Sequence, residues 1–171
     1  MTQNHEPIKL DTKHGARVLR EVLRDAFPNT QFSVRCSFYA GGSSIRVSYK
    51  DGPPEVRVSD LARKFQGRGF DGMSDSSYVT GNTIKSRGIL YAAPFAFVSV
   101  SRDTSHAAHE DARKVLAQHY GAWTQLTEFD RMHYTHNLVR CSWIDAGHLR
   151  IDDTQDVDDM ARFGRLREVT T

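Results

Sequence analysis

The chain has 171 residues, 39% of them hydrophobic and 26% charged, values typical of a globular protein and not of a disordered or fibrous one. Its formal net charge of +2 and pI near 8.6 are well short of the balance of a protein that coats nucleic acid. The chain does not open with a signal-peptide pattern, and it has no apolar run of about 18 residues. We therefore expect neither secretion nor membrane insertion, and a cytoplasmic protein.

A helix is the first element that the sequence predicts after ten polar residues that form a loose arm or a short strand. Apolar residues recur on one side at the helical period: Val18, Leu19, Val22, Leu23, Ala26 and Phe27. Asp11 or Thr12 is a suitable N-cap, and Pro28 ends the helix at Phe27 because it disfavours α geometry in the residue before it.

A hairpin follows, because the apolar period changes from helical spacing to two after Asn29. Burying both apolar sets on one face requires paired residue numbers with an odd sum, and a turn centred between Ala40 and Gly41 makes that sum 81. The buried pairs are then Cys36 with Ile45, Val34 with Val47, and Phe32 with Tyr49. The outward pairs are Arg35 with Arg46 and Ser33 with Ser48.

The middle of the chain predicts a second helix and a long strand. Val56 and Val58 are expected to be extended, with Ser59 as the N-cap of a helix that ends at Gly67. The glycine-rich residues 65–75 predict a loop whose Phe70 and Met73 pack into the core. Residues 89–100 are apolar on both phases around Pro94, which favours a central strand broken at the proline.

The last third predicts a helix over 106–120, a stretch without clean period that can hold a short helix, and a strand over 138–144. Asp145, Ala146 and Gly147 can turn that strand into a partner that includes Leu149 and Ile151. Cys36 and Cys141 both take apolar strand positions, so we expect buried thiols. The predicted class is α+β, an antiparallel sheet with an N-terminal α-β-β-α unit and helices mainly on one face. One domain is expected over 1–151, with a charged C-terminal tail over 152–171.

Basic residues gather on positions that the predicted core does not use. Arg35 and Arg46 face each other across the hairpin and repel unless an anion lies over them. Lys50 shares their face, and the solvent side of the first helix carries a row of three more, Arg17, Arg20 and Arg24. Residues 13–68 contain 11 Lys and Arg against 5 Asp and Glu, a local charge of +6. A phosphate backbone is the obvious partner, and the ordinary alternative is a solvated surface neutralised by nearby carboxylates.

The first half of the chain resembles the large polyvalent protein-associated domains of phages and conjugative elements. The matching blocks are VL at 18–19, FP at 27–28, FSVR at 32–35, GGSSIRV at 41–47, DGP at 51–53, FQG at 65–67 and FDGMSD at 70–75. Residues 91–101 match loosely, and the chain beyond about Gly121 does not match. The resemblance implies a mobile-element origin and a part in DNA transfer or in resisting host defence. It transfers no catalytic residues.

No catalytic motif accompanies these elements. His106, His109 and Glu110, or His133, His136 and Cys141, lack the spacing of a zinc signature. The carboxylates of Glu128, Asp130, Asp145, Asp152 and Asp153 have no spacing that puts them on one face as a Mg²⁺ site would need. The glycine-rich stretch lacks the Lys-Ser/Thr of a P-loop. We expect no catalytic residue, no metal and no cofactor.

Three hypotheses of function follow. The first is a non-enzymatic protein that counters host defence, of the anti-restriction or anti-CRISPR type, by binding a host nuclease or nucleoprotein complex. The second is a nucleic-acid-binding accessory module that uses the basic hairpin face. The third is a metal-dependent enzyme, which the missing motifs make the weakest of the three.

Overall fold

The computed structural model describes residues 7–40, 42–86, 88–151 and 156–164, which separate into two compact units. Unit 1 is Met1–Tyr49 with Val56–Ser101, and unit 2 is Lys50–Glu55 with Arg102–Thr171. Each unit has a hydrophobic core of its own. The predicted α+β class is confirmed. The prediction of one domain over 1–151 stays a prediction, since two compact units can still fold together.

Unit 1 begins with the predicted helix and hairpin. Helix α1 (Thr12–Ala26) is capped by the Asp11 side chain, which accepts a hydrogen bond from the His14 N–H at 2.9 Å. It ends where the Phe27 N–H donates to the Leu23 carbonyl. Strands β2 (Phe32–Tyr39) and β3 (Gly42–Lys50) pair antiparallel, and every pair in their register sums to 81. The predicted helix and register are both confirmed.

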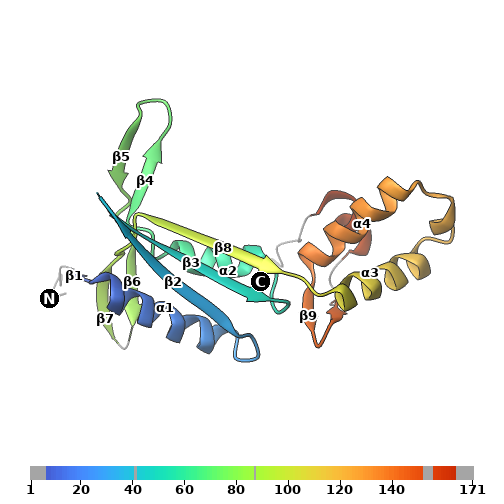
Figure 1. Ribbon diagram of the computed structural model, residues 1–171, viewed down its shortest axis with the longest axis horizontal. Helices are drawn as coiled ribbons and strands as arrows, with labels where there is room; N and C mark the ends of the chain where they lie inside the picture. The colour runs from blue at the N-terminus through green and yellow to red at the C-terminus, as the bar shows by residue number, and fades with distance from the viewer. Residues whose placement is uncertain (1–6, 41, 87, 152–155, 165–171) are drawn as a thin grey trace, which may run out of the picture. The chain divides into compact units, whose positions relative to one another are not determined.

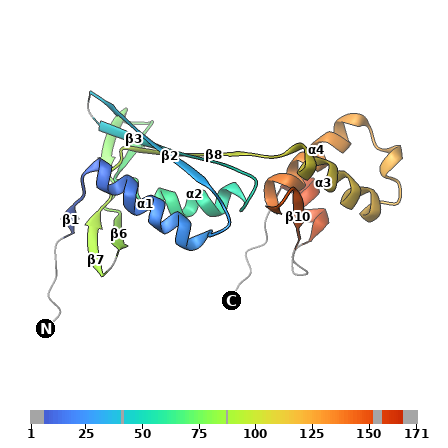
Figure 2. The same cartoon turned by 60° about the horizontal axis from the view of Figure 1, so that its bottom comes forward.

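A three-stranded sheet of order β2-β3-β8 is the frame of unit 1. Strand β8 (Phe97–Asp103) runs in the same direction as β3 (Figure 1), and the Ala96 N–H donates to the Ser43 carbonyl at 2.8 Å. Helices α1 and α2 (Glu55–Arg63) lie on one face of this sheet (Figure 2). The core between the helices and the sheet includes Leu19, Leu23, Val34, Ile45, Val47, Val58, Ala62, Phe65 and Phe95.

Two features of this unit correct the prediction for the middle of the chain. Val56 and Val58 belong to α2, because Pro53 and Pro54 come directly before a first turn that opens with Glu55, a favourable helix start. The chain is interrupted around Pro94 as predicted, but into two strands, β7 (Ile89–Ala92) and β8. Strand β8 lies at the edge of its sheet and has one exposed face, so the expectation of a central strand is wrong for it.

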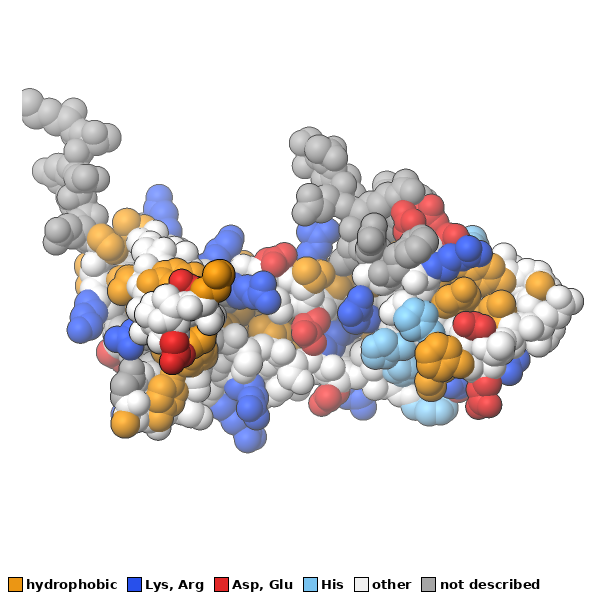
Figure 3. Space-filling model, turned by 90° about the horizontal axis from the view of Figure 1, so that it is seen from above, with side chains coloured by type: hydrophobic (Ala, Val, Ile, Leu, Met, Phe, Trp, Pro, Cys, Tyr) orange, Lys and Arg blue, Asp and Glu red, His pale blue; other side chains and the backbone are white. Residues whose placement is uncertain are grey.

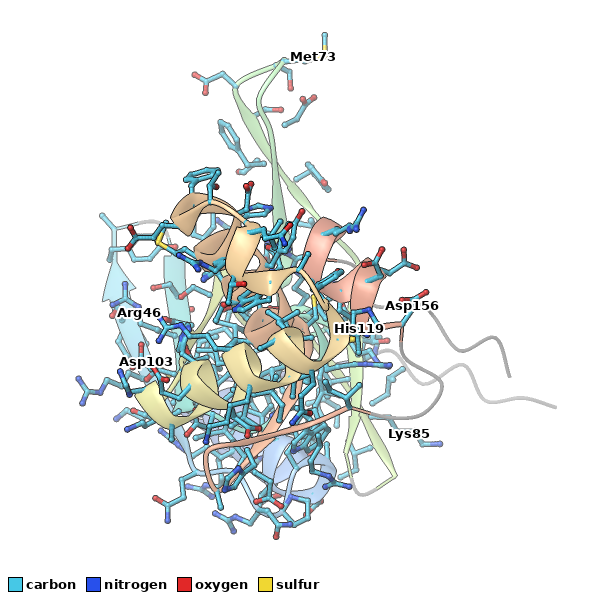
Figure 4. All side chains as sticks on the ribbon, turned by 90° about the vertical axis from the view of Figure 1, so that its right-hand side faces the viewer. Arg46, Met73, Lys85, Asp103, His119 and Asp156 are labelled. Atoms are coloured by element: carbon cyan, nitrogen blue, oxygen red, sulfur yellow. The ribbon has the colours of Figure 1, made fainter. Side chains whose placement is uncertain are left out.

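Short strands complete unit 1. Strand β1 (Ile8–Lys9) pairs parallel with β7, and β6 (Thr83–Ser86) pairs antiparallel with β7. Strands β4 (Arg68–Asp71) and β5 (Ser76–Val79) form a hairpin that projects from the unit, with Met73 at its tip (Figure 4). Phe70 is 57% and Met73 100% exposed, so their predicted place in the core is wrong. The Asp71 carboxylate closes the turn by accepting from the Met73 N–H and the Ser74 hydroxyl.

Unit 2 is mainly helical. It contains α3 (His106–His119), η1 (Trp123–Gln125), α4 (Glu128–Cys141), the paired strands β9 (Trp143–Asp145) and β10 (His148–Arg150), and the π-helical turn η2 (Asp159–Phe163). Its core comprises Ala108, Ala112, Leu116, Leu138, Val139, Cys141, Ile144, Met160 and Ala161.

The predicted strand over 138–144 is wrong over its first half, where residues 138–141 are the last turn of α4. Thr135, Leu138, Val139 and Ser142 are buried at i, i+3, i+4 and i+7, a helical stripe that outweighs the short alternation of apolar residues. The predicted turn is confirmed, since Ala146 and Gly147 both have positive φ, 50° and 83°, between β9 and β10.

The cysteines and the tail differ in part from expectation. Cys141 is buried on a helix, and Cys36 on β2 is only partly buried. In the predicted tail, Met160 and Ala161 pack into the core of unit 2, while residues 152–155 and 165–171 lie outside the described part of the chain. Over the residues that the structure describes, no helix combines the length and the apolar character needed to cross a bilayer.

Candidate nucleic-acid interface

The outward face of the β2-β3-β8 sheet holds a hollow of about 570 Å³. Its lining residues are Arg35 from β2, Arg46 and Ser48 from β3, and Ser99 and Ser101 from β8. All five belong to unit 1. The hollow therefore lies on one sheet face, within one unit, and every side chain that lines it is charged or carries a hydroxyl.

Strand alternation puts these side chains together. Val34 and Val47 are buried in the core on the inner face, so Arg35 and Arg46, their neighbours in sequence, point outward. The register pairs Arg35 directly with Arg46, and directly opposed residues have Cβ atoms about 4.5–5.5 Å apart. No carboxylate among the described residues forms an ion pair with either guanidinium. Two neighbouring positive charges thus face solvent without a neutralising partner in the described chain.

The hydroxyls beside this pair extend its hydrogen-bonding capacity. Arginine supplies five N–H donors in a planar fork that suits phosphate or carboxylate oxygens, and each serine adds an O–H donor. Donors of this kind around a hollow with two positive charges fit an anion with several oxygens.

The remaining predicted residues are not all on this face. Helix α1 packs against the inner face of the sheet, so Arg17 and Arg24, exposed on its solvent side, cannot share the outward face with Arg35. The Arg20 guanidinium donates to the Val34 carbonyl at 2.6 Å, on the edge strand β2. Lys50 is exposed at the end of β3 and is not one of the residues that line the hollow. The predicted basic surface is therefore divided between a sheet face and a helix row.

Sequence reasoning missed Ser99 and Ser101. The signal was present, because Phe97, Ser99 and Ser101 alternate with Val98 and Val100, the period of a strand with one wet face. Treating residues 89–100 as one strand covered on both faces hid that alternation.

The charges of the two units have opposite sign. Unit 1 contains 13 Lys and Arg against 7 Asp and Glu, a charge of +6, and unit 2 contains 10 against 14, a charge of −4. Lys and Arg side chains are spread over the face of unit 1 that Figure 3 shows. A sequence charge of +2 therefore conceals a distinctly basic unit, to which the hollow belongs.

Histidines gather on the surface of unit 2, beside an exposed hydrophobic group (Figure 3). His109 Nε2 lies 2.9 Å from the Thr104 hydroxyl, and burial, with His136 nearby, lowers the pKa of His109. Among the described residues, no three His, Cys, Asp or Glu side chains form a group that could hold a metal ion. Asp152 and Asp153, two of the carboxylates whose spacing argued against a Mg²⁺ site, lie outside those residues.

The fold and the hollow together describe an α+β protein whose outward sheet face carries two arginines and three serines. The chain belongs to the family large polyvalent protein associated domain 29, whose match extends over residues 10–142, from just before α1 to just after α4. This confirms the resemblance and extends it past Gly121, beyond which the sequence alone showed no match. The family is associated with the polyvalent proteins of phages and other mobile elements. No curated protein and no solved structure matches the chain.

Proposed function

We propose that this chain is a nucleic-acid-binding accessory module of a mobile element, and that the sheet face of unit 1 holds the phosphate backbone. The observation that carries the proposal is the pair Arg35 and Arg46, opposed across β2 and β3 at the rim of a hydroxyl-lined hollow. Directly opposed like charges destabilise a sheet unless anions offset them. Backbone phosphates, one at each guanidinium group, supply those anions.

Salt dependence tests the proposal. Each neutralised phosphate contributes about 0.7–0.9 to the slope of log K against log salt. The double variant Arg35→Gln with Arg46→Gln is therefore expected to flatten that slope by about 1.4–1.8 and to weaken binding of an oligonucleotide. Removing the repulsion should also raise the melting temperature of the free protein slightly.

The matched control is Arg17→Gln with Arg24→Gln, which removes the same charge from the helix row of the same unit. We expect this variant to reduce affinity less and to leave the slope nearer to that of the wild type. Equal effects of the two double variants would mean that only the overall charge of unit 1 matters, and the sheet face would lose its assigned role.

A second candidate is a non-enzymatic protein that counters host defence by binding a host nuclease or nucleoprotein complex. Membership of a family associated with mobile elements favours it, and an acidic protein surface could occupy the same arginine pair. Phage plating on a host with and without its restriction nuclease tests this role. If expression of the wild type protects the phage and the Arg35→Gln, Arg46→Gln variant does not, the sheet face acts in counter-defence.

A further inference from the structure

We propose that the sheet face of unit 1 selects single-stranded over duplex nucleic acid, by stacking bases on Tyr39 and Phe97 while Arg35 and Arg46 hold the phosphates. The inference rests on the proposed function and narrows its ligand to one class. It comes from two large aromatic side chains that face solvent at one end of the face that carries the hollow.

Tyr39 lies on the outward face because it follows Arg35 by four residues on β2, an even number. Its partner in the register is Gly42. A Cβ at Gly42 would lie 3.4 Å from the Tyr39 Oη and 3.2 Å from the Ala96 Cβ, so the tyrosine ring extends across the glycine. The Tyr39 hydroxyl also lies 3.5 Å from the Ser43 carbonyl. The ring is thereby held across the sheet and remains 43% exposed.

Phe97 opens β8 and has the same phase as Ser99 and Ser101, which line the hollow. It is 55% exposed, whereas Val98 and Val100, of the opposite phase, pack against the core. Neither Phe97 nor Tyr39 belongs to the core of unit 1. Both rings therefore offer an accessible surface, which every base can use for stacking whatever its sequence.

The aromatic side chains and the arginines are separated along the strands. Gly42, under the Tyr39 ring, and Arg46 are four residues apart on β3, or about 13 Å at about 3.3 Å per residue. A single strand can place bases on the aromatic end and phosphates at the arginines, because its bases are not paired with each other. In a duplex the paired bases cannot reach a flat sheet face, so Tyr39 and Phe97 would contribute little.

The projecting hairpin of β4 and β5 is the element of unit 1 whose shape suits a duplex groove. Asp71 and Asp75 lie in its turn region and are exposed, and their charges repel phosphates. Arg68 at the base of the hairpin is its one cation against these two aspartates. A basic sheet face and carboxylates toward the tip of the hairpin both favour a single strand as the ligand.

The experiment measures binding of the full chain to a single-stranded oligonucleotide of about 20 nucleotides and to the duplex of the same sequence. We expect the single strand to bind at least about 10-fold more tightly. Tyr39→Leu or Phe97→Leu should weaken single-strand binding by about 5- to 150-fold, the effect of losing one stacked base, and leave the salt slope unchanged. Thermal melts confirm that each variant is folded.

Phe38→Leu is the matched control, because Phe38 neighbours Tyr39, is 63% exposed and points to the opposite face of β2. It should bind like the wild type. Equal affinity for single strand and duplex, with Tyr39→Leu and Phe97→Leu unchanged, would overturn the selectivity, while the proposed function would stand if the arginine variant still weakened both. Failure to bind either oligonucleotide at low salt would overturn both.

Discussion

Among the partly exposed side chains described, we expect replacement of Arg102, in unit 2, to lower the free energy of unfolding most. Its guanidinium donates to the carbonyls of Asp51 at 3.0 Å and Gly52 at 2.9 Å. It also donates to three carbonyls at the end of α4, those of Val139, Arg140 and Ser142, at 3.2, 3.3 and 3.0 Å. One side chain thus joins the Lys50–Glu55 segment to the C-terminus of α4, where helix carbonyls lack partners and a positive charge is favourable.

The magnitude follows from these bonds. A hydrogen bond from a charged donor contributes about 1.5–3 kcal/mol, and five bonds from one group are not additive. Lysine keeps the charge but has a single ammonium that cannot reach all five oxygens. We therefore expect Arg102→Lys to destabilise unit 2 by about 2–4 kcal/mol. At about 4–8 °C per kcal/mol for a unit of this size, the melting temperature should fall by about 8–30 °C.

Tryptophan fluorescence during urea unfolding is the suitable assay, because both tryptophans of the chain, Trp123 and Trp143, belong to unit 2. The control is Arg113→Lys, an exposed arginine of α3 that forms an ion pair with Glu110, and it should change stability by no more than about 1 kcal/mol. An Arg102→Lys protein within about 0.5 kcal/mol of the wild type would refute the role assigned to the five bonds.

Three further predictions concern the core, a histidine and the thiols. Val47→Asp should unfold unit 1 because it places an unpaired charge at a fully buried position, whereas Ser33→Asp on the exposed face should leave unit 1 folded. Equal losses of melting temperature in circular dichroism melts of the two variants would contradict the strand phase. Since burial lowers the pKa of His109 in the folded protein below 6.5, its contribution to stability is fully present above pH 6.5 and is lost as the pH falls through the folded pKa. His109→Asn should therefore show a smaller drop in urea midpoint between pH 7.5 and pH 5.5 than the wild type, and an unchanged drop would count against this. Burial raises the pKa of both thiols, and Cys141 is only 4% exposed. A bulky maleimide should therefore label Cys36 slowly and Cys141 only after denaturation. Rapid labelling of Cys141 in the native protein would show that α4 opens.

The predictable part of the fold is the part whose signals are local. The helix ending at Phe27 and the β2-β3 register followed from an apolar period, a proline and a short turn, all read within about 40 residues. The last turn of α4 could not be read in this way, because Val139, Cys141 and Trp143 alternate over too few residues to separate strand from helix. Its helical state depends on packing against Ala112, Leu116 and Met160, contacts that no local pattern contains.

The candidate site was predictable to the same extent. The Arg35 and Arg46 pair follows from register alone, since a one-residue slip would have turned one arginine into the core. The position of the helix row of Arg17, Arg20 and Arg24 relative to the sheet does not follow from the sequence, because the helical period places residues only on a face of their own helix. A helix covers the face of the sheet that carries the apolar side chains. Val34 and Val47 lie on that face, so α1 packs there, on the side opposite the arginine pair.

Arg102 also explains why the two units cannot be separated by a single cut in the sequence. Asp51 and Gly52, which accept two of its hydrogen bonds, lie between β3 and α2 in sequence but belong to unit 2. A truncation after Ser101 would remove the donor and leave those carbonyls without it, and would also remove Ile144, which bridges Gly52. The family match ends at Ser142, the last carbonyl of α4 that Arg102 binds, so it includes the guanidinium and all five of its acceptors. The matched segment therefore keeps all five hydrogen bonds of Arg102 but not the pairing of Gly52 with Ile144, so a fragment that keeps both has to extend at least to Ile144.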